Sequence, residues 1–326
     1  SDLHQTATEA DGRLEREERF SEALSGLEEQ LADLPSFTEV DRYLLSNNDI
    51  PAEALAKLDT GKAPRSSYLS SDASKIQVFV LFGLDGVDSS DSVMLVALDR
   101  VHQKIKLISL ARDSYVFIPE YGFFSKLAYS YTWGGAAMAV KNLNYNYYLN
   151  VSDYIAVDFD QLAEIIDRIG GVTVNIDEDE ARYLSGYPNV HVGDCLLDGE
   201  TAVSYARIRK SSATDSDRKR TGRQREVILS ILNTLQTMPL SQYPGFVRDC
   251  LGMCATSFEA ETLLTMAAET LGQNYTVEQY FFPEGQVDWW AGLIKEYFYY
   301  VYDLRRASDR IYRIIYEELY ISGYDD

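Results

Sequence analysis

The segment between residues 76 and 176 alternates between strand-like and helix-like stretches, and this order restricts the possible folds more than any other feature. It begins with IQVFVLFGL at 76–84, which is apolar enough for a buried strand. Strands are also expected at 93–98 and 104–110, and the connection at 99–103 is short enough for a hairpin. The elements expected next are a helix at 134–144, a strand at 153–157, a helix at 159–169 and a strand at 172–176.

This alternation predicts an α/β fold, an α-β-α layered domain with a central mixed β-sheet. The sheet is expected to be mixed because the hairpin makes neighbouring strands antiparallel. Apolar residues at helical spacing in EVILSILNTLQ at 226–236 predict that a long helix continues there. Further helices are expected at 259–271, 291–303 and 309–320.

The chain is predicted to have three parts: a helical extension or stalk at 1–60, a linker at 61–75 and one domain at 76–326. The extension carries an apolar stripe that covers about two heptads, fewer than a coiled coil needs. We therefore expect the stripe to pack on the main domain or on a partner helix. Its residues are Phe20, Leu24, Leu27, Leu31 and Leu34.

The chain is strongly acidic, with 30 Lys+Arg, 51 Asp+Glu and a net charge of -21. This charge argues against nucleic acid as a partner, since a phosphate backbone needs a broad basic surface. No apolar run is long enough to cross a membrane, and the chain opens with Ser1, so we expect that a membrane anchor upstream was removed. Cys195, Cys250 and Cys254 are interpreted as packing residues or as one optional disulfide plus a free thiol.

Residues 207–225 reverse the charge of the chain. This stretch contains eight cations and only two acids, Asp215 and Asp217. Arginine binds phosphate oxygens in a bidentate manner, so the cluster suggests a phosphate or pyrophosphate site. A solvated, mobile basic loop is the alternative interpretation. The cations are Arg207, Arg209, Lys210, Arg218, Lys219, Arg220, Arg223 and Arg225.

Two sets of arginines within this stretch are expected to face one anion. If YARIRK is extended, Arg207 and Arg209 point to the same face of a strand. A second set lies near one face of the first turns of the long helix, where a bound anion would meet free backbone N–H groups. This set consists of Asp217, Arg220, Arg223 and Gln224.

Carboxylates follow the first buried strand at Asp85 and Asp91, and this placement suits Mg²⁺ that is shared with substrate phosphates. The alternative is that these residues only form a turn. The pair Arg112 and Asp113 directly follows IKLISL, where it marks the edge of a site or a surface ion pair. Together the arginines and carboxylates predict phosphoryl-transfer chemistry. No Walker motif is present.

Several ordered pieces of the chain resemble the LytR–CpsA–Psr family of bacterial cell-wall glycopolymer transferases. The resemblance covers roughly 76–238 well and 239–326 diffusely. The pieces are LFGLD at 81–85, SDSVMLVALD at 90–99, KIKLISLARDSYVFIPEYG at 104–122, KLAYSYTWGG at 126–135, DYIAVDFDQLAEIIDRIGGVTVNI at 153–176, LDGETAVSYARIRK at 197–210 and DSDRKRTGRQREV at 215–227.

The resemblance implies an extracellular domain on a single membrane anchor. It also implies Mg²⁺-dependent transfer of a glycan phosphate from a polyprenyl-pyrophosphate carrier to a peptidoglycan sugar hydroxyl, with a pyrophosphatase side activity as a further expectation. It assigns Asp85 and Asp91 to the metal. Five arginines match the pyrophosphate-binding positions, and four more residues match other characteristic polar positions. The arginines are Arg112, Arg207, Arg209, Arg220 and Arg223, and the other residues are Asp113, Lys126, Asp217 and Gln224.

One departure from the family pattern affects the metal loop. Ser89 stands where the family has an arginine, and the loop that begins at Asp85 is short. Two functions are therefore weighed: the transferase described above, in which Asp85 or Asp91 assists deprotonation of the acceptor, and a non-catalytic module that binds polyprenyl phosphates or regulates envelope assembly.

Overall fold

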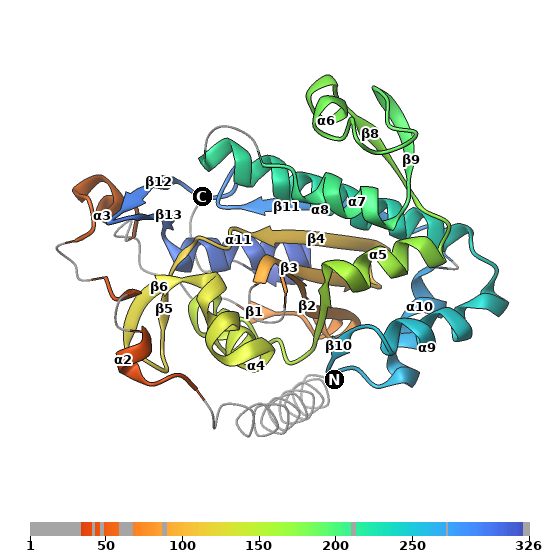
Figure 1. Cartoon of the computed structure of the whole chain (residues 1–326). Coiled ribbons are helices and arrows are strands. Elements are labelled where there is room, and N and C mark those ends of the chain that lie inside the picture. Colours follow the sequence, from red (N-terminus) through yellow and green to blue (C-terminus); the bar gives the residue numbers. More distant parts are fainter. Residues whose placement is uncertain are drawn as a thin grey trace, which may run out of the picture.

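The computed structural model describes residues 34–40, 43–45, 49–58, 68–86, 90–209, 213–271 and 273–321. A six-stranded sheet with the order β10-β7-β2-β3-β4-β11 forms its centre (Figure 1). Strands β2, β3 and β4 are antiparallel neighbours, whereas β7 runs parallel to β2 and β11 parallel to β4. The predicted mixed sheet is thus confirmed. Its strands are β2 (Ile76–Leu84), β3 (Ser90–Asp99), β4 (Lys104–Leu110), β7 (Tyr154–Asp158), β10 (Ala255–Thr256) and β11 (Thr276–Phe282).

Helices cover both faces of this sheet. One face packs against α4 (Leu127–Tyr147) and α11 (Leu304–Tyr316), and the other packs against α8 (Ala213–Thr237) and α10 (Ala260–Leu271). Because strand side chains alternate, Leu95 belongs to the first core and Met94 to the second. The layered α-β-α arrangement that the sequence predicts is therefore present.

The remaining helices and strands lie around these layers. The other helices are α2 (Phe37–Val40), α3 (Ala52–Leu58), α5 (Phe159–Arg168), α6 (Glu178–Tyr183), α7 (Gly199–Arg207) and α9 (Tyr243–Leu251), with short 3-10 turns η3 (Ser71–Lys75), η4 (Leu240–Gln242) and η5 (Glu317–Leu319). Two-stranded ladders pair β1 (Tyr68–Leu69) with β14 (Tyr320–Ile321), β5 (Tyr115–Ile118) with β6 (Phe123–Lys126), β8 (Val172–Ile176) with β9 (Gly193–Leu197) and β12 (Trp289–Ile294) with β13 (Tyr297–Tyr302).

The unit formed by α5 to α7 and the β8–β9 ladder has its own apolar core, and α6, β8 and β9 stand out at the top of Figure 1. Aspartates begin its three helices: Asp158, Asp177 and Asp198 each accept a backbone N–H three residues on, as N-caps do. Gly199 is required at the start of α7, since a Cβ there would lie 2.1 Å from the carbonyl oxygen of Ala163 in α5.

Two predicted helices near the C-terminus differ from the structure. The helix expected at 291–303 is wrong, because this region forms the β12–β13 hairpin with a turn at Lys295, whose φ is 54°. The sequence WWAGLIKEYFYYVY is rich in aromatic residues, which favour a strand once cross-strand neighbours are available. The last helix begins earlier than expected, at Leu304, and ends at Tyr316.

The N-terminal part of the chain contacts the main domain where it is described. Ile50 and Ala54 join a small core with Tyr299 and Val301 of β13, and β1 pairs with β14. The stripe predicted at 20–34 lies outside the described residues except for Leu34, which packs against the core under α4. Within the described part, no helix combines the length and apolar character that a membrane span needs.

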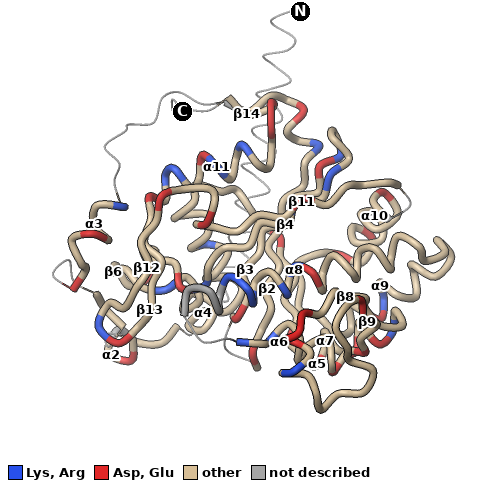
Figure 2. The backbone as a smooth tube through the Cα atoms, turned by 90° about the horizontal axis from the view of Figure 1, so that it is seen from above, with Lys and Arg blue, Asp and Glu red and all other residues tan. Residues whose placement is uncertain are grey.

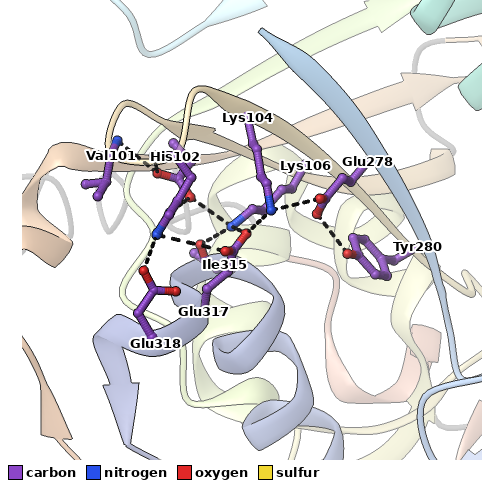
Figure 3. Close-up of polar contacts among 10 residues, drawn as sticks. Val101, His102, Lys104, Lys106, Glu278, Tyr280, Ile315, Glu317 and Glu318 are labelled. Carbon is purple, nitrogen blue, oxygen red and sulfur yellow. Dashed lines mark hydrogen bonds and ion pairs between the residues drawn. The ribbon is translucent and has the colours of Figure 1, made fainter.

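A buried charge network joins the β3–β4 hairpin to the C-terminal end of α11 (Figure 3). The fully buried Nζ of Lys106 donates to Asp99 at 2.8 Å, to the carbonyl oxygen of Ile315 at 2.8 Å and pairs with Glu317 at 3.0 Å. Lys104 donates to the same Glu317 at 2.6 Å. Asp99, His102 and Glu317 are close enough for a metal, but these lysines account for the gathered carboxylates without one.

We expect Lys106→Met to lower the free energy of unfolding by about 3–5 kcal/mol, because the fully buried Asp99 would lose the charge of Lys106 and keep only its contacts with His102 and two backbone N–H groups. Lys75→Met is the control, since Lys75 pairs with Asp72 at the surface, where both side chains are more than half exposed. Urea unfolding followed by circular dichroism measures both. Equal stability of the two variants would contradict this role of Lys106.

We expect the stability of the protein to fall as the pH rises above neutral, through His102. Burial lowers the pKa of His102, but hydrogen bonds to Glu318 and Asp99 and the nearby Glu317 raise it by more, so the folded-state pKa lies above its usual value. This stabilisation is complete below the unfolded pKa of about 6.5 and is lost as the pH rises through the folded pKa. His102→Gln should unfold with a smaller difference between pH 6 and pH 9 than the parent protein, and an unchanged difference would refute the mechanism.

Candidate functional site

The predicted carboxylates and arginines meet at one edge of the central sheet. Strand β2 ends at Leu84 and β4 at Leu110, and antiparallel β3 begins at this same edge. Asp85 therefore follows β2, Asp91 opens β3, and Arg112 follows β4. Figure 2 shows blue basic segments close together around β2, β3 and the start of α8, in the middle of the view.

Asp91 is the centre of this edge. Its side chain is only 6% exposed, and each of its oxygens accepts a hydrogen bond from an arginine. Nη1 of Arg112 donates to Oδ1, and Nη2 of Arg209 donates to Oδ2 at 3.5 Å. A buried carboxylate needs such partners, because removal of its charge from water is costly. Asp91 thus fixes the position of two arginines from distant parts of the chain.

A second carboxylate extends this line of charges. Asp113 accepts a hydrogen bond from Lys126 Nζ at 2.7 Å, and its other oxygen lies 3.8 Å from Nε of Arg112. The same Nζ lies 5.7 Å and 5.4 Å from the ring centroids of Tyr297 and Tyr299. Lys126, which the family resemblance selected, is therefore brought next to Arg112 by the β5–β6 ladder.

Arg207 reaches the site from a different element than predicted. It pairs with Asp85 at 3.0 Å, and its guanidinium lies 4.4 Å from the ring centroid of Phe159 at the start of α5. Both side chains of the pair remain partly exposed, Arg207 by 48% and Asp85 by 42%. A ligand can therefore reach this pair from solvent.

The strand predicted for YARIRK is wrong, because Arg207 is the last residue of helix α7 and Arg209 follows outside any helix or strand. The N-cap Asp198 starts the helix, and Tyr205 and Ala206 bury against the small core around β8 and β9. Both arginines still meet carboxylates at the sheet edge. The end of α7 thus brings each of the two side chains to a carboxylate of this edge, although they do not share a strand face.

The helix predicted to carry the second arginine set is α8, and it begins earlier than expected, at Ala213. Arg220 and Gln224 are buried on it, and Oε1 of Gln224 has no hydrogen-bond partner among the described residues. Arg223 is also buried; it pairs with Glu180 of α6 at 3.0 Å and donates to the carbonyl oxygen of Ile208. These contacts hold the segment that carries Arg209, whereas anion binding by Arg223 stays a prediction. The side chain of Asp217 and all of Ser89 lie outside the described part.

Sequence reasoning counted Arg225 in the basic stretch but did not assign it to the site. Its Nη1 donates to Ser109 of β4 at 2.9 Å, so it lies on the sheet side of α8. Phe159 was also missed as a partner of Arg207. Position on a helix relative to a distant strand is not readable from local spacing, so only the charge reversal in the sequence could have pointed to Arg225.

The two carboxylates differ in their capacity to hold a cation. Both oxygens of Asp91 accept hydrogen bonds from arginines, whereas Oδ2 of Asp85 has no bonded partner among the described residues. Carboxylate oxygens are the ligand type that Mg²⁺ takes, together with substrate phosphates. The donor set at this edge thus has the right chemistry for a shared magnesium ion, with Asp85 as the accessible ligand.

Comparison with known proteins identifies the family. The model of the LytR_cpsA_psr family matches residues 48–311, which is most of the chain. This protein therefore belongs to the LytR–CpsA–Psr family, and the resemblance described from the sequence is confirmed.

Individual relatives agree with this assignment. The polyisoprenyl-teichoic acid–peptidoglycan teichoic acid transferase TagU of Oceanobacillus iheyensis is 29% identical over 230 residues, 67% of this chain and 69% of that protein. The regulatory protein MsrR of Staphylococcus aureus is 31% identical over 184 residues, 53% of this chain and 54% of its own length. The crystal structure of TagT from B. subtilis shares the fold at a TM-score of 0.62 and 20% identity, covering 76% of this chain and 96% of TagT.

We expect Arg223→Met to lower the free energy of unfolding by about 3–5 kcal/mol, since it leaves Glu180 buried without its partner. Arg182→Met in α6 is the matched control, because the side chain of Arg182 is 74% exposed and pairs with Asp179 at the surface. Guanidinium unfolding of both variants tests the difference. If Arg223→Met is as stable as its control, Arg223 does not hold α6 and α8 together.

Proposed function

We propose that this protein transfers a glycan phosphate from a polyprenyl-pyrophosphate carrier to a sugar hydroxyl of peptidoglycan. The proposal rests on one observation: Arg112, Arg207 and Arg209 converge on the carboxylates of Asp85 and Asp91 at one sheet edge. Relatives named as teichoic acid transferases acting on peptidoglycan support the choice of polymer and acceptor.

The arginines bind the diphosphate in this proposal. Arg207 and Arg209 are about half exposed, so their remaining N–H groups can turn to phosphate oxygens while one N–H stays on a carboxylate. Arg112 is less exposed and fixed by Asp91, so it presents a preoriented charge. Such fixed charges stabilise the negative charge that develops during phosphoryl transfer.

Asp85 is the better general base of the two carboxylates. Both oxygens of Asp91 accept hydrogen bonds from arginines, which leaves little room for an acceptor hydroxyl. Asp85 is exposed to solvent and has an oxygen that is not bonded to the described residues, so an acceptor hydroxyl can approach it. Geometry of this kind is the first requirement for a general base.

The proposed reaction is balanced as follows. Asp85 takes the proton of the sugar hydroxyl, and the hydroxyl oxygen attacks the phosphorus that carries the glycan. The bond from this phosphorus to the bridging oxygen breaks, and polyprenyl monophosphate leaves with the electron pair. Mg²⁺ held at this edge by Asp85 and Asp91 would neutralise phosphate charge, and Asp85 would act as the base through the carboxylate oxygen that the ion leaves free.

This reaction requires a location at the extracellular face of the bacterial cell membrane, where the carrier and peptidoglycan meet. We propose an anchor that precedes the present sequence. The relatives named for peptidoglycan transfer support an envelope location.

A non-catalytic module that holds polyprenyl phosphates is the second candidate. Two observations favour this module. Both oxygens of Asp91 are paired with arginines, so Asp91 offers no free oxygen to a metal. Position 89 is a serine, so this loop lacks the additional cation that the family pattern has there. Purified protein with a lipid-diphosphate glycan, peptidoglycan and Mg²⁺ separates the two functions. Binding without a glycan–peptidoglycan product would support the module and exclude the transferase.

We expect Arg207→Ala and Arg209→Ala each to reduce transfer by about 100-fold or more, because each removes a charge-assisted contact to the diphosphate. Arg168→Ala is the control; Arg168 forms a surface pair with Asp249 at the far end of α5 and should keep full activity. Product formation is followed with labelled carrier. Unchanged transfer by both site variants would reject the proposed role.

A further inference from the structure

Arg225 is a partly buried cation near the same sheet edge, and none of the steps above uses it. It lies on α8, where its Nη1 donates to Ser109 Oγ at 2.9 Å and its guanidinium carbon lies 6.0 Å from the ring centroid of Phe281. Its Nε is buried and has no hydrogen-bond partner among the described residues. The hydroxyl and the ring orient the guanidinium but do not neutralise it.

No carboxylate pairs with Arg225 within the described part of the chain, although Arg112, Arg207, Arg209 and Arg223 all have one. Burial lowers the pKa of Arg225 to about 10, because desolvation disfavours the charged form and no anion offsets it. A charge that is partly removed from water and has no acidic partner lowers the stability of the folded state. Such an arrangement is typical of a site whose counter-ion is a ligand.

The position of Arg225 links the charged edge to the apolar layer under α8. Ser109 lies in β4, and Arg112 follows it by three residues, just beyond the end of the strand, so their Cα atoms are at most about 11 Å apart. One helical turn beyond Arg225, Ile228 packs with the core between α8 and the sheet. Gln224, the residue before Arg225, carries a buried oxygen that has no hydrogen-bond partner in the described part of the chain. An anion held by Arg112 and Arg209 can therefore extend to Arg225 along the sheet.

We propose that Arg225 is a further anion-binding residue of this site, donating to the diphosphate on the side that faces the apolar layer under α8. Ser109 is a positioning residue, because it holds the guanidinium toward the sheet edge. This inference rests on the proposed diphosphate donor.

The alternative is that Arg225 serves only to stabilise the fold, and this alternative predicts a different effect of its substitution on stability. If its contacts with Ser109 and Phe281 served the fold, their removal would destabilise the protein. If Arg225 instead serves to bind an anionic ligand, an apolar side chain of similar length should keep or raise the stability of the unliganded protein and weaken ligand binding. Stability and affinity therefore change in opposite directions only under the proposal.

The test compares Arg225→Met, Arg225→Lys and the parent protein by isothermal titration calorimetry and thermal unfolding. The probes are inorganic pyrophosphate, farnesyl diphosphate and farnesol. Comparison of the three distinguishes binding of the diphosphate anion from binding of the apolar chain. We expect Arg225→Met to bind both diphosphates roughly 10- to 100-fold more weakly, with a melting temperature at or above that of the parent. Arg225→Lys should recover part of the affinity, and farnesol binding should not change.

Arg100→Met is the matched control, because Arg100 is a paired cation that contacts Glu269 and Gln77 at the other end of the sheet. It should lower the melting temperature and leave pyrophosphate affinity unchanged. If Arg225→Met behaves like this control, or if the parent binds no pyrophosphate, the proposal is overturned. If diphosphate binding depends on Arg225 but the protein transfers no glycan, only the proposed function is rejected. If the protein transfers glycan and Arg225→Met binds the diphosphates as tightly as the parent, only this inference is rejected.

Discussion

The buried carboxylate of Asp91 is the interaction on which the candidate site depends. Its charge is tolerable at 6% exposure only because Arg112 and Arg209 each bond one of its oxygens. These arginines come from the end of β4 and from the segment after α7, so one carboxylate ties the sheet to the unit built on β8 and β9. The site is thereby assembled from elements that share no local sequence.

The same hairpin carries a second buried charge network at its opposite end. There Asp99, Lys106 and Glu317 satisfy one another and fasten α11 to the sheet. At the site end, by contrast, Asp85 and Gln224 have oxygens without a bonded partner among the described residues, and Arg225 has no carboxylate there. Charged groups that are all paired stabilise the fold, whereas polar groups without a partner remain available to a ligand. Strands β3 and β4 connect the two clusters.

Much of the fold was predictable because it depends on local patterns. Apolar runs marked β2, β3 and β4, the short connection marked their hairpin, and a 3.6-residue period marked α5 and α8. The errors occurred where tertiary contacts override local preference. The tyrosines at 297–302 have a spacing that suits a helix, yet they form β13 because Trp289 and its neighbours pair with them in β12.

The sequence alone determined the chemical character of the site: a dense basic stretch in an acidic chain, two carboxylates after a buried strand, and a family pattern around them. Only the tertiary structure decided which charges meet. It placed Arg207 at a helix end beside Asp85, gave Arg223 to Glu180, and left Arg225 without an acidic partner in the described part. The reason is physical: charge is a property of a residue, but pairing and burial depend on the distance between elements that only the packed fold brings together.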